Sequence, residues 1–306
     1  MDRDILQHLP VVAVVARRRS FAAAAAELGL GPSAVSHAVR MVEDRLRIAL
    51  FARTTRSVSL TEAGQAFLAR ALPALDAIHE AAEATQARDG RVTGVLRINA
   101  PRVALPLVLV DLLHELAGLH PDLTVEVTTD DALVDIVAAG YDAGIRLGEM
   151  IPEDMVAVRL TPPFKAIMVA SPAYLATAAP VESLDDLRAH NCIGYRQAST
   201  GGSYAWEVLD DGRASAVATR GTARVTDPLL AFDLALAGVG IAYLFEPLVR
   251  RQVREGALRW LLPNSAIEEP GLFLYFPRRA SEAPKMRAFI DAARQRTQRG
   301  QGIAQS

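Results

Sequence analysis

Residues 20–46, SFAAAAAELGLGPSAVSHAVRMVEDRL, predict two short helices joined by a tight turn. Ser20 is a favourable N-cap for a helix over 21–28, because its side-chain oxygen can accept a hydrogen bond from a free backbone N–H. Gly29 ends that helix. Gly31-Pro32 begins the next one, since proline is preferred at the first helical position. Two helices with a small turn between them form a helix–turn–helix.

The second helix has two chemically different faces. Its apolar residues recur at helical spacing from Val35 to Leu46, so one face is expected to be buried. The opposite face carries short hydrogen-bonding and cationic side chains, which are groups that read base edges in the major groove. A solvated helix face is the alternative interpretation. The candidate DNA contacts on this helix are Pro32, Ser33, Ser36, His37 and Arg40.

A ribbon and a long helix follow. Residues 51–61, FARTTRSVSLT, alternate and are rich in Thr, Ser and Val, which favours a short β-ribbon. Its turn holds Arg53 and Arg56, which we expect to neutralise phosphates or to enter the minor groove. Thr61 then caps a helix that continues to about Arg88, a length of about 40 Å. Its apolar stripe predicts packing against a second copy of the chain.

From Val92 onward, strands alternate with helices, which predicts a mainly parallel sheet with helices on both faces. Gly118 and Gly140 are expected to end two of these helices. The predicted strands are 95–101, 123–129, 141–148, 166–171, 240–244 and 271–277, and the predicted helices are 105–117, 132–139, 229–238 and 285–296.

Charge is distributed unevenly along the chain. The 306 residues have a formal net charge of −2, which on its own argues against a nucleic-acid ligand. Residues 1–60 nevertheless hold nine arginines and five acids, a net of +4, and the remainder has a net of −6. Only Lys165 and Lys285 are lysines. Arginine suits anion recognition, although a GC-rich genome explains the same bias. The basic excess is therefore confined to the predicted helix–turn–helix.

Recognisable catalytic and metal-binding patterns are missing from the sequence. A single cysteine, Cys192, excludes an intramolecular disulfide, and the six histidines show no zinc-ligand spacing. There is no G-x-S-x-G elbow, and Gly238-Val239-Gly240 is better explained as a helix end than as a dinucleotide motif. Cys192 is expected to be buried and structural, with a reactive thiol as the alternative. We expect no enzyme activity, no cofactor and no metal ion.

The N-terminal residues MDRDILQHLP contain acids and do not resemble a signal peptide. Runs of about 18 apolar residues, which a membrane-spanning helix requires, are also missing. We therefore expect a cytoplasmic protein without a membrane partner.

Open α/β sheets bind small molecules at the carboxyl ends of their strands, and this rule selects candidate ligand contacts. Arg102 or Arg146 could hold a carboxylate through two hydrogen bonds, which makes an anion a candidate ligand. A solvated or ion-paired arginine is the alternative for each. The polar loop at 199–203 either faces a ligand or is a plain surface loop. The candidates are Ala100, Pro101, Arg102, Thr129, Arg146, Ser199, Thr200, Gly201, Thr226, Asp227 and Phe245.

Residues 20–64 resemble the LysR-type transcriptional regulators. The matching motifs occur in order: the Ser-Phe helix start, A-x-x-L, A-V-S in the recognition helix, L-F-x-R-T before the wing, and L-T-E-A-G at the start of the linker helix. The resemblance covers the whole chain. YDAGIRLG, ASPAYL, HNCIGYR, ALAGVGIAYL and REGALRWLL, which lie between residues 141 and 262, resemble the effector domain of the family.

This resemblance implies an α/β fold with an N-terminal winged helix–turn–helix, a long linker helix and a two-lobed effector domain like periplasmic binding proteins. A small-molecule effector would bind between the lobes. Double-stranded promoter or operator DNA is the implied partner, together with a second copy of the chain in a homodimer or homotetramer, and RNA polymerase is a candidate protein partner. The implied domains are 1–60, 61–90 and 91–306, with lobe I at about 92–161 and 268–296 and lobe II at about 162–267.

Ser33, Ser36 and Arg53 fall at positions that the family uses on DNA. The sequence departs from the family at His37, where arginine is common, at Gly31-Pro32, where Ser-Gln is frequent, and at Ala100, where many members have Ser or Thr. Two other functions stay open. One is an enzyme or solute-binding protein on the same α/β domain, and the other is an architectural DNA binder without an effector.

Overall fold

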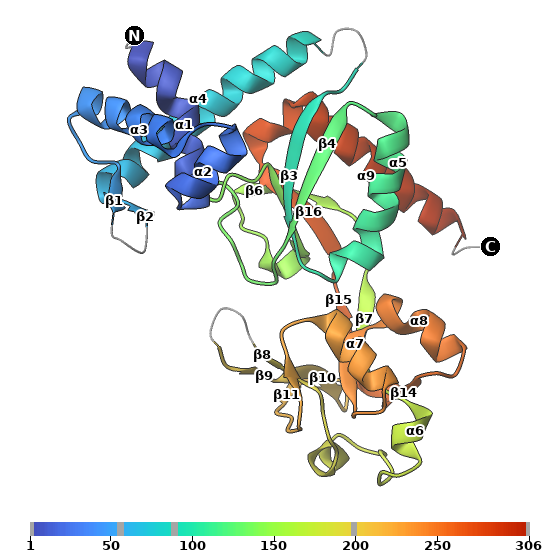
Figure 1. The fold of residues 1–306 in the computed structure, drawn as a ribbon. Helices are drawn as coiled ribbons and strands as arrows, with labels where there is room; N and C mark the ends of the chain where they lie inside the picture. The colour runs from blue at the N-terminus through green and yellow to red at the C-terminus, as the bar shows by residue number, and fades with distance from the viewer. Residues whose placement is uncertain (1–2, 54–57, 87–90, 197–200, 304–306) are drawn as a thin grey trace. The chain divides into compact units, whose positions relative to one another are not determined.

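The computed structural model describes residues 3–53, 58–86, 91–196 and 201–303. These residues form two compact units (Figure 1). The first comprises Met1–Thr93 with Val137–Gly140, and the second comprises Gly94–Ile136 with Tyr141–Ser306. Each unit has its own apolar core.

Local hydrogen bonds set the helix ends of the first unit. The Ser20 Oγ accepts a hydrogen bond from the Ala23 backbone N–H at 3.2 Å, as an N-cap does. Gly29 ends the second helix with a left-handed φ of +64°. Gly31 and Pro32 begin the third, as predicted. The elements are α1 (Arg3–Arg18), α2 (Phe21–Leu28), α3 (Pro32–Leu46), β1 (Phe51–Arg53), β2 (Val58–Leu60) and α4 (Glu62–Gln86).

The core of this unit lies between α1, α3 and the start of α4. Val35, Val39 and Val42 on α3 are fully buried, and they pack in one cluster with Val12 on α1 and Leu68 on α4. Each such side chain stabilises the fold by about 2 kcal/mol relative to an exposed position. The helical spacing seen in the sequence therefore identifies the buried face of α3 correctly.

A five-stranded sheet forms the first half of the second unit, in the order β4-β3-β5-β16-β6. The strand β3 is parallel to β4 and β5, but β16 is antiparallel to β5 and β6, so the expected mainly parallel sheet is wrong. The chain leaves this sheet after β6 and returns to it at β16, and the Leu160 N–H donates to the Leu272 carbonyl where the two crossings meet, so β16 runs back antiparallel to β6. These strands are β3 (Gly94–Ala100), β4 (Leu123–Thr129), β5 (Ala143–Leu147), β6 (Met155–Arg159) and β16 (Leu272–Pro277).

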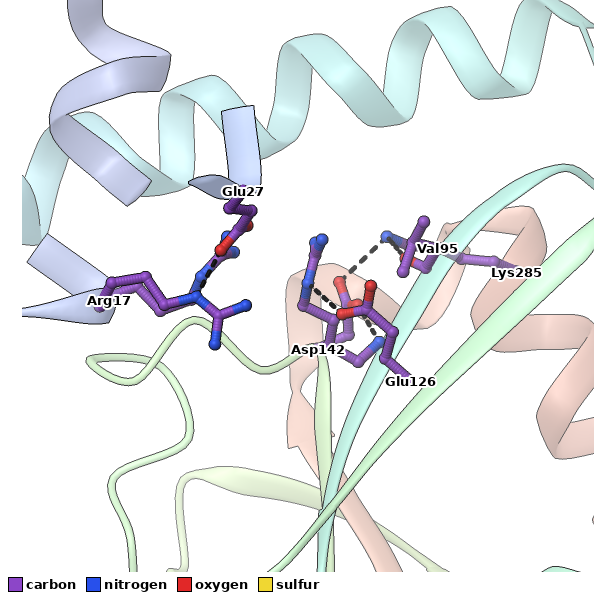
Figure 2. A network of polar contacts seen from close by, with 8 residues as sticks. Arg17, Glu27, Val95, Glu126, Asp142 and Lys285 are labelled. Carbon is purple, nitrogen blue, oxygen red and sulfur yellow. Dashed lines mark hydrogen bonds and ion pairs between the residues drawn. The ribbon is translucent and has the colours of Figure 1, made fainter. Parts of the chain in front are cut away.

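Two helices cover this sheet side by side, α5 (Val110–Leu119) and α9 (Pro284–Ile303) (Figure 1). A π-helical turn precedes α5, and α5 continues through Gly118, which was expected to end it. Lys285 fixes α9 to the sheet, because its Nζ donates to the Val95 carbonyl at 2.9 Å and pairs with Asp142 at 3.1 Å (Figure 2). Asp142 also accepts a hydrogen bond from the Arg97 backbone N–H.

The helix predicted over 132–139 is also wrong, because bends and turns occupy this segment. Three of its residues, Val134, Ile136 and Val137, are β-branched and lose side-chain freedom in a helix. In addition, the Ala132 carbonyl accepts a hydrogen bond from Arg146 instead of a helical N–H.

A second sheet is centred on β7 (Phe164–Ala170), whose partners β13, β14 and β15 are all antiparallel to it. Successive β7 side chains point to opposite faces. Ile167 and Val169 belong to the core under α7 and α8, and Met168 belongs to the core that contains Trp206. The other elements are α6 (Pro172–Leu175), β8 (Gly194–Arg196), β9 (Ser203–Tyr204), β10 (Trp206–Asp210), β11 (Arg213–Val217), β12 (Arg224–Val225), α7 (Pro228–Leu236), β13 (Ala242–Phe245), α8 (Glu246–Arg254), β14 (Arg259–Leu261) and β15 (Ile267–Glu269).

The chain passes between the two sheets twice, and the two connecting segments are bonded to each other. The Leu160 N–H donates to the Leu272 carbonyl at 2.8 Å, and the Leu272 N–H donates to the Thr161 Oγ1 at 2.9 Å. Gly271 has a φ of +92°, and a Cβ there would lie 2.7 Å from the Pro162 carbonyl oxygen. Only glycine therefore fits this close approach.

Candidate functional site

One candidate site is the exposed face of α3. Pro32, Ser33, His37 and Arg40 are exposed and Ser36 is half-buried, opposite the buried valines. The turn of residues 29–31 and the proline at the first helical position fix where this face begins. The structure thus brings together the five predicted contacts of this helix on one accessible face.

The arginines of the first unit differ in whether they form ion pairs within the protein. Arg17 and Arg18 both bind Glu27, joining α1 to α2 (Figure 2). Arg45 pairs with Asp4. Within the described residues, Arg40 has neither an ion pair nor a side-chain hydrogen bond, so its guanidinium is available to a phosphate or base.

Glu43 attaches the β1–β2 wing to α3, a role that the sequence did not indicate. The Glu43 Oε1 accepts hydrogen bonds from the Leu50 and Phe51 backbone N–H groups, at 2.8 and 3.2 Å. The spacing of Glu43 gives no signal of this role, because its partners lie beyond the helix. Arg53 is the last residue of β1 and pairs with Val58, while the predicted contact Arg56 lies outside the described residues.

The second candidate site is a cavity of about 440 Å³ in the second unit. This is within the range of small-molecule sites, which are usually about 300–1,000 Å³. Its walls come from the loop after β4, from the turn after β5, from β8 to β10, from the start of α7, and from the ends of β13 and β15. The lining residues are Asp131, Ala132, Leu133, Leu147, Glu149, Met150, Tyr195, Arg196, Tyr204, Glu207, Thr226, Pro228, Tyr243, Leu244, Phe245 and Glu269.

Two of the predicted ligand contacts, Thr226 and Phe245, line this cavity. Gly201 is not a lining residue, but its carbonyl accepts a hydrogen bond from Nε of the lining residue Arg196 at 3.3 Å. Ser199 and Thr200 lie outside the described residues. The other predicted contacts are not among the lining residues that the structure describes: Ala100, Pro101, Arg102, Thr129, Arg146 and Asp227.

Arg146 is buried beneath this region, with only 2% of its surface exposed. Its guanidinium donates to the carbonyls of Ile145, Asp130 and Ala132 and to the Asn99 side chain, at 2.7–3.1 Å. Burial lowers the pKa of Arg146 from its usual value. The observed role of this side chain is to hold the loop after β4 against β5.

Cys192 has 1% of its surface exposed, and burial raises the pKa of its thiol to about 11. A thiol of that pKa is almost wholly protonated near neutrality and is therefore a poor nucleophile. Gly238 has a φ of +79° directly after α7, as expected for a helix end. In the part of the chain that the structure describes, no cluster of His, Cys, Asp and Glu is suited to hold a metal ion. None of the helices in that part combines the length and apolarity that a membrane span needs.

Family models match both parts of the chain. The model described as "Bacterial regulatory helix-turn-helix protein, lysR family" matches residues 6–65, and "LysR substrate binding domain" matches residues 89–298. The chain belongs to the LysR family. It is a LysR-type transcriptional regulator with a helix–turn–helix and an effector-binding domain.

Relatives of this LysR-type regulator cover nearly its full length. The uncharacterized HTH-type transcriptional regulator YcaN of Escherichia coli K12 is 40% identical over 90% of each chain. PgrR of the same organism is 33% identical over 95% of this chain and 97% of its own. The solved structure of CrgA from Neisseria meningitidis has a TM-score of 0.59 at 26% identity, covering 94% of this chain and 98% of its own. AphB of Vibrio cholerae, at 20% identity, shares the fold with a TM-score of 0.59 over 94% and 98% of the two chains.

In this LysR-type regulator an ion pair joins the loop after β3 to the start of α7. Arg102 Nη1 lies 3.3 Å from Asp227 Oδ2, and Asp227 Oδ1 accepts a hydrogen bond from the Leu229 N–H as the N-cap of α7. We expect Arg102→Ala to lower the free energy of unfolding by less than about 1 kcal/mol, because the pair is exposed. Asp227→Ala also removes the cap and should cost about 1–2 kcal/mol.

Asp227→Asn is the control for this pair, because asparagine keeps the cap and loses the charge. In urea denaturation, Asp227→Asn should lose about as much free energy of unfolding as Arg102→Ala. Equal losses for Asp227→Asn and Asp227→Ala would contradict the assignment of the larger cost to the cap.

Proposed function

We propose that this regulator reads operator DNA with the exposed face of α3 in the major groove and the β1–β2 wing on the backbone or in the minor groove. The main support is that one accessible face of α3 carries Ser33, Ser36, His37 and Arg40, while the opposite face of this helix is buried in the core. Hydroxyl, imidazole and guanidinium groups can bind base edges and phosphates. Arg53 and Arg56 are proposed to contact the backbone or minor groove from the wing.

We further propose that the cavity holds the small-molecule effector. It lies in the part of the chain that matches the family's substrate-binding domain, and Thr226 and Phe245 line it. Effector binding alters promoter engagement only if the effector prefers one arrangement of the protein over another. The two connecting segments between the sheets are the natural place for such a change. Effector contacts by Ala100, Pro101, Arg102, Thr129, Arg146, Ser199, Thr200, Gly201 and Asp227 stay predictions.

The proposal includes self-association through α4 into a homodimer or homotetramer. Ile78 on this helix has 55% of its surface exposed, which suits a partner helix. We propose domains at 1–60, 61–90 and 91–306, with lobes at about 92–161 with 268–296 and at 162–267. The two sheets support the lobes, since each is built mainly from one of these ranges. A DNA-binding regulator of this kind would act in the cytoplasm, with RNA polymerase as a candidate partner and no enzymatic turnover.

Binding to the DNA upstream of its own gene tests the α3 assignment. Arg40→Ala should weaken binding to all sequences and reduce the slope of log K against log salt by about 1, because one phosphate contact is lost. Ser36→Ala should instead relax preference at particular base pairs, by about 1–3 kcal/mol of discrimination. Fluorescence anisotropy over a range of salt concentrations measures both.

Arg45→Ala is the matched control, since it removes the same charge from the same helix where Asp4 already pairs with it. It should change affinity much less than Arg40→Ala. Binding that does not respond to salt, or equal losses for the two arginines, would contradict the proposed face.

A further inference from the structure

The cavity is acidic. Four of its lining residues carry carboxylates, Asp131, Glu149, Glu207 and Glu269, and one, Arg196, is basic. Within the described residues, none of the four carboxylates forms an ion pair with an arginine or lysine. Asp131 is stabilised by the nearby charges of Arg102 and Arg146. Glu149, Glu207 and Glu269 repel one another instead, and a positively charged ligand would relieve that repulsion.

Glu269 and Asp131 are the half-buried members of this group, whereas Glu149 and Glu207 are exposed. Glu269 lies on β15, opposite Phe164 of β7. Burial, together with the neighbouring negative charges of Glu149 and Glu207, raises the pKa of Glu269 to about 7. Removing a carboxylate from water without a cation is costly, and the carboxylate then holds its proton more tightly. The cavity thus favours positive charge at this position.

Aromatic walls complete the cavity. The Tyr195 hydroxyl donates to the Tyr243 carbonyl at 3.0 Å, and the Tyr243 hydroxyl donates to the Glu207 carbonyl. Since backbone groups already use these hydroxyls, the rings contribute mainly apolar surface to the lining. Burial raises the pKa of Tyr195, Tyr204 and Tyr243, which keeps their phenols neutral. Aromatic rings next to carboxylates favour ammonium groups through cation–π attraction.

An anion has less to bind here. Arg146 donates to four groups of the protein and does not line the cavity, and Arg102 pairs with Asp227. The anionic effector suggested by the sequence therefore gains no support. A bare metal ion fits no better, because among the described residues no group of His, Cys, Asp and Glu is suited to hold one. A larger cation could contact both the carboxylates and the aromatic walls.

We propose that the effector is an organic amine, bound as a cation with its ammonium group on Glu269 and its carbon frame against the tyrosine walls. This inference rests on the proposed role of the cavity as the effector site. Glu149 from the turn after β5 and Glu207 from β10 supply the remaining negative charge, and Arg196 from β8 is the single opposing cation of the lining. Tyr204 of β9 and Tyr243 of β13 also face this position, as neutral groups.

Two charge-matched pairs of probes test the proposal on the full-length protein. Tyramine and 4-hydroxyphenylacetate share a ring and differ in the sign of their charge, as do the flexible pair cadaverine and glutarate. Isothermal titration calorimetry at pH 8 and low salt should show at least one amine binding at least tenfold more tightly than its matched acid. Its affinity should fall about tenfold at pH 6, because Glu269 must lose its proton to pair with the ammonium group.

Glu269→Gln keeps the shape of the side chain and removes the charge. It should weaken amine binding at least tenfold and abolish the pH dependence between pH 6 and pH 8. Glu268→Gln is the control, since Glu268 is the adjacent exposed residue of β15 and is not among the lining residues. It should change neither the affinity nor the pH dependence.

Amines that bind no better than their acids, no binding by either amine, or full amine affinity in Glu269→Gln would overturn the proposal. These outcomes are distinguishable from a failure of the cavity as effector site. An acid whose binding is blocked by the cavity-filling variant Thr226→Trp would leave the effector site standing and refute the amine. If Thr226→Trp leaves binding intact, the probe binds elsewhere, and the cavity is not the effector site.

Discussion

Replacing Gly64 with alanine is expected to destabilise the winged helix–turn–helix strongly. A Cβ at this position would lie 2.1 Å from the Leu50 carbonyl oxygen and 2.8 Å from its carbon. These are backbone atoms, so no side-chain rotation relieves the clash. The same carbonyl accepts the Thr61 N–H at 2.9 Å, and Thr61 Oγ1 caps α4 by accepting the Gly64 N–H at 2.9 Å. Relief by backbone movement would therefore break the start of α4.

We expect Gly64→Ala to lower the free energy of unfolding of the first unit by about 3 kcal/mol, at the upper end of overpacking costs. For a unit of this size that corresponds to a drop in Tm of roughly 15 °C. Operator binding should be lost in parallel. Circular dichroism melting and anisotropy with operator DNA measure the two effects.

Gly118→Ala provides the matched control. Gly118 lies inside α5, and a Cβ there would have no heavy atom within 4 Å. Alanine should be neutral or should stabilise the helix by up to about 1 kcal/mol, because glycine is the poorer helix former. Similar melting of the two variants would contradict the steric explanation.

Gly64 also shows what a sequence pattern conveys and what it omits. The L-T-E-A-G motif indicates the start of a helix, and Thr61 does cap α4. The motif does not say why the glycine is there, because the reason is a contact with Leu50, which lies on the other side of the wing. The ends of α2 and α3 were predictable for the opposite reason, since Ser20, Gly29 and Pro32 act on backbone groups within a few residues.

The cavity lined by Thr226 and Phe245 likewise contains residues that the sequence could indicate and residues that it could not. Thr226 and Phe245 were predictable, because ligands of α/β folds bind where strands end. Glu149 follows β5 directly, so the same rule could have selected it. Glu207 and Glu269 could not be selected, since they lie within short strands that the alternation of larger elements does not reveal. The acidity of the cavity depends on residues between 131 and 269, which only the folded chain brings together.

Arg146→Met is the second substitution with a large expected effect, and it separates a structural arginine from a ligand-binding one. The change leaves the Asn99 Oδ1 and the carbonyls of Ile145, Asp130 and Ala132 without their buried donor. Each buried acceptor left unsatisfied costs about 1–3 kcal/mol. We expect a loss of about 3–5 kcal/mol in the free energy of unfolding, measured by urea denaturation at pH 7. Arg146→Lys should recover only part of it, because an ammonium group lacks the planar fork that reaches several acceptors.

Arg97→Met is the control on the same sheet. Arg97 pairs with Glu126 at 2.9 Å with its side chain 31% exposed, and an exposed pair of this kind contributes less than about 1 kcal/mol. A loss at Arg146 no larger than that at Arg97 would show that the four hydrogen bonds do not stabilise the fold. Arg146 would then be free to bind the effector, as its position near the end of β5 first suggested. A large loss means instead that this arginine orders the loop after β4 through its bonds to the Asp130 and Ala132 carbonyls.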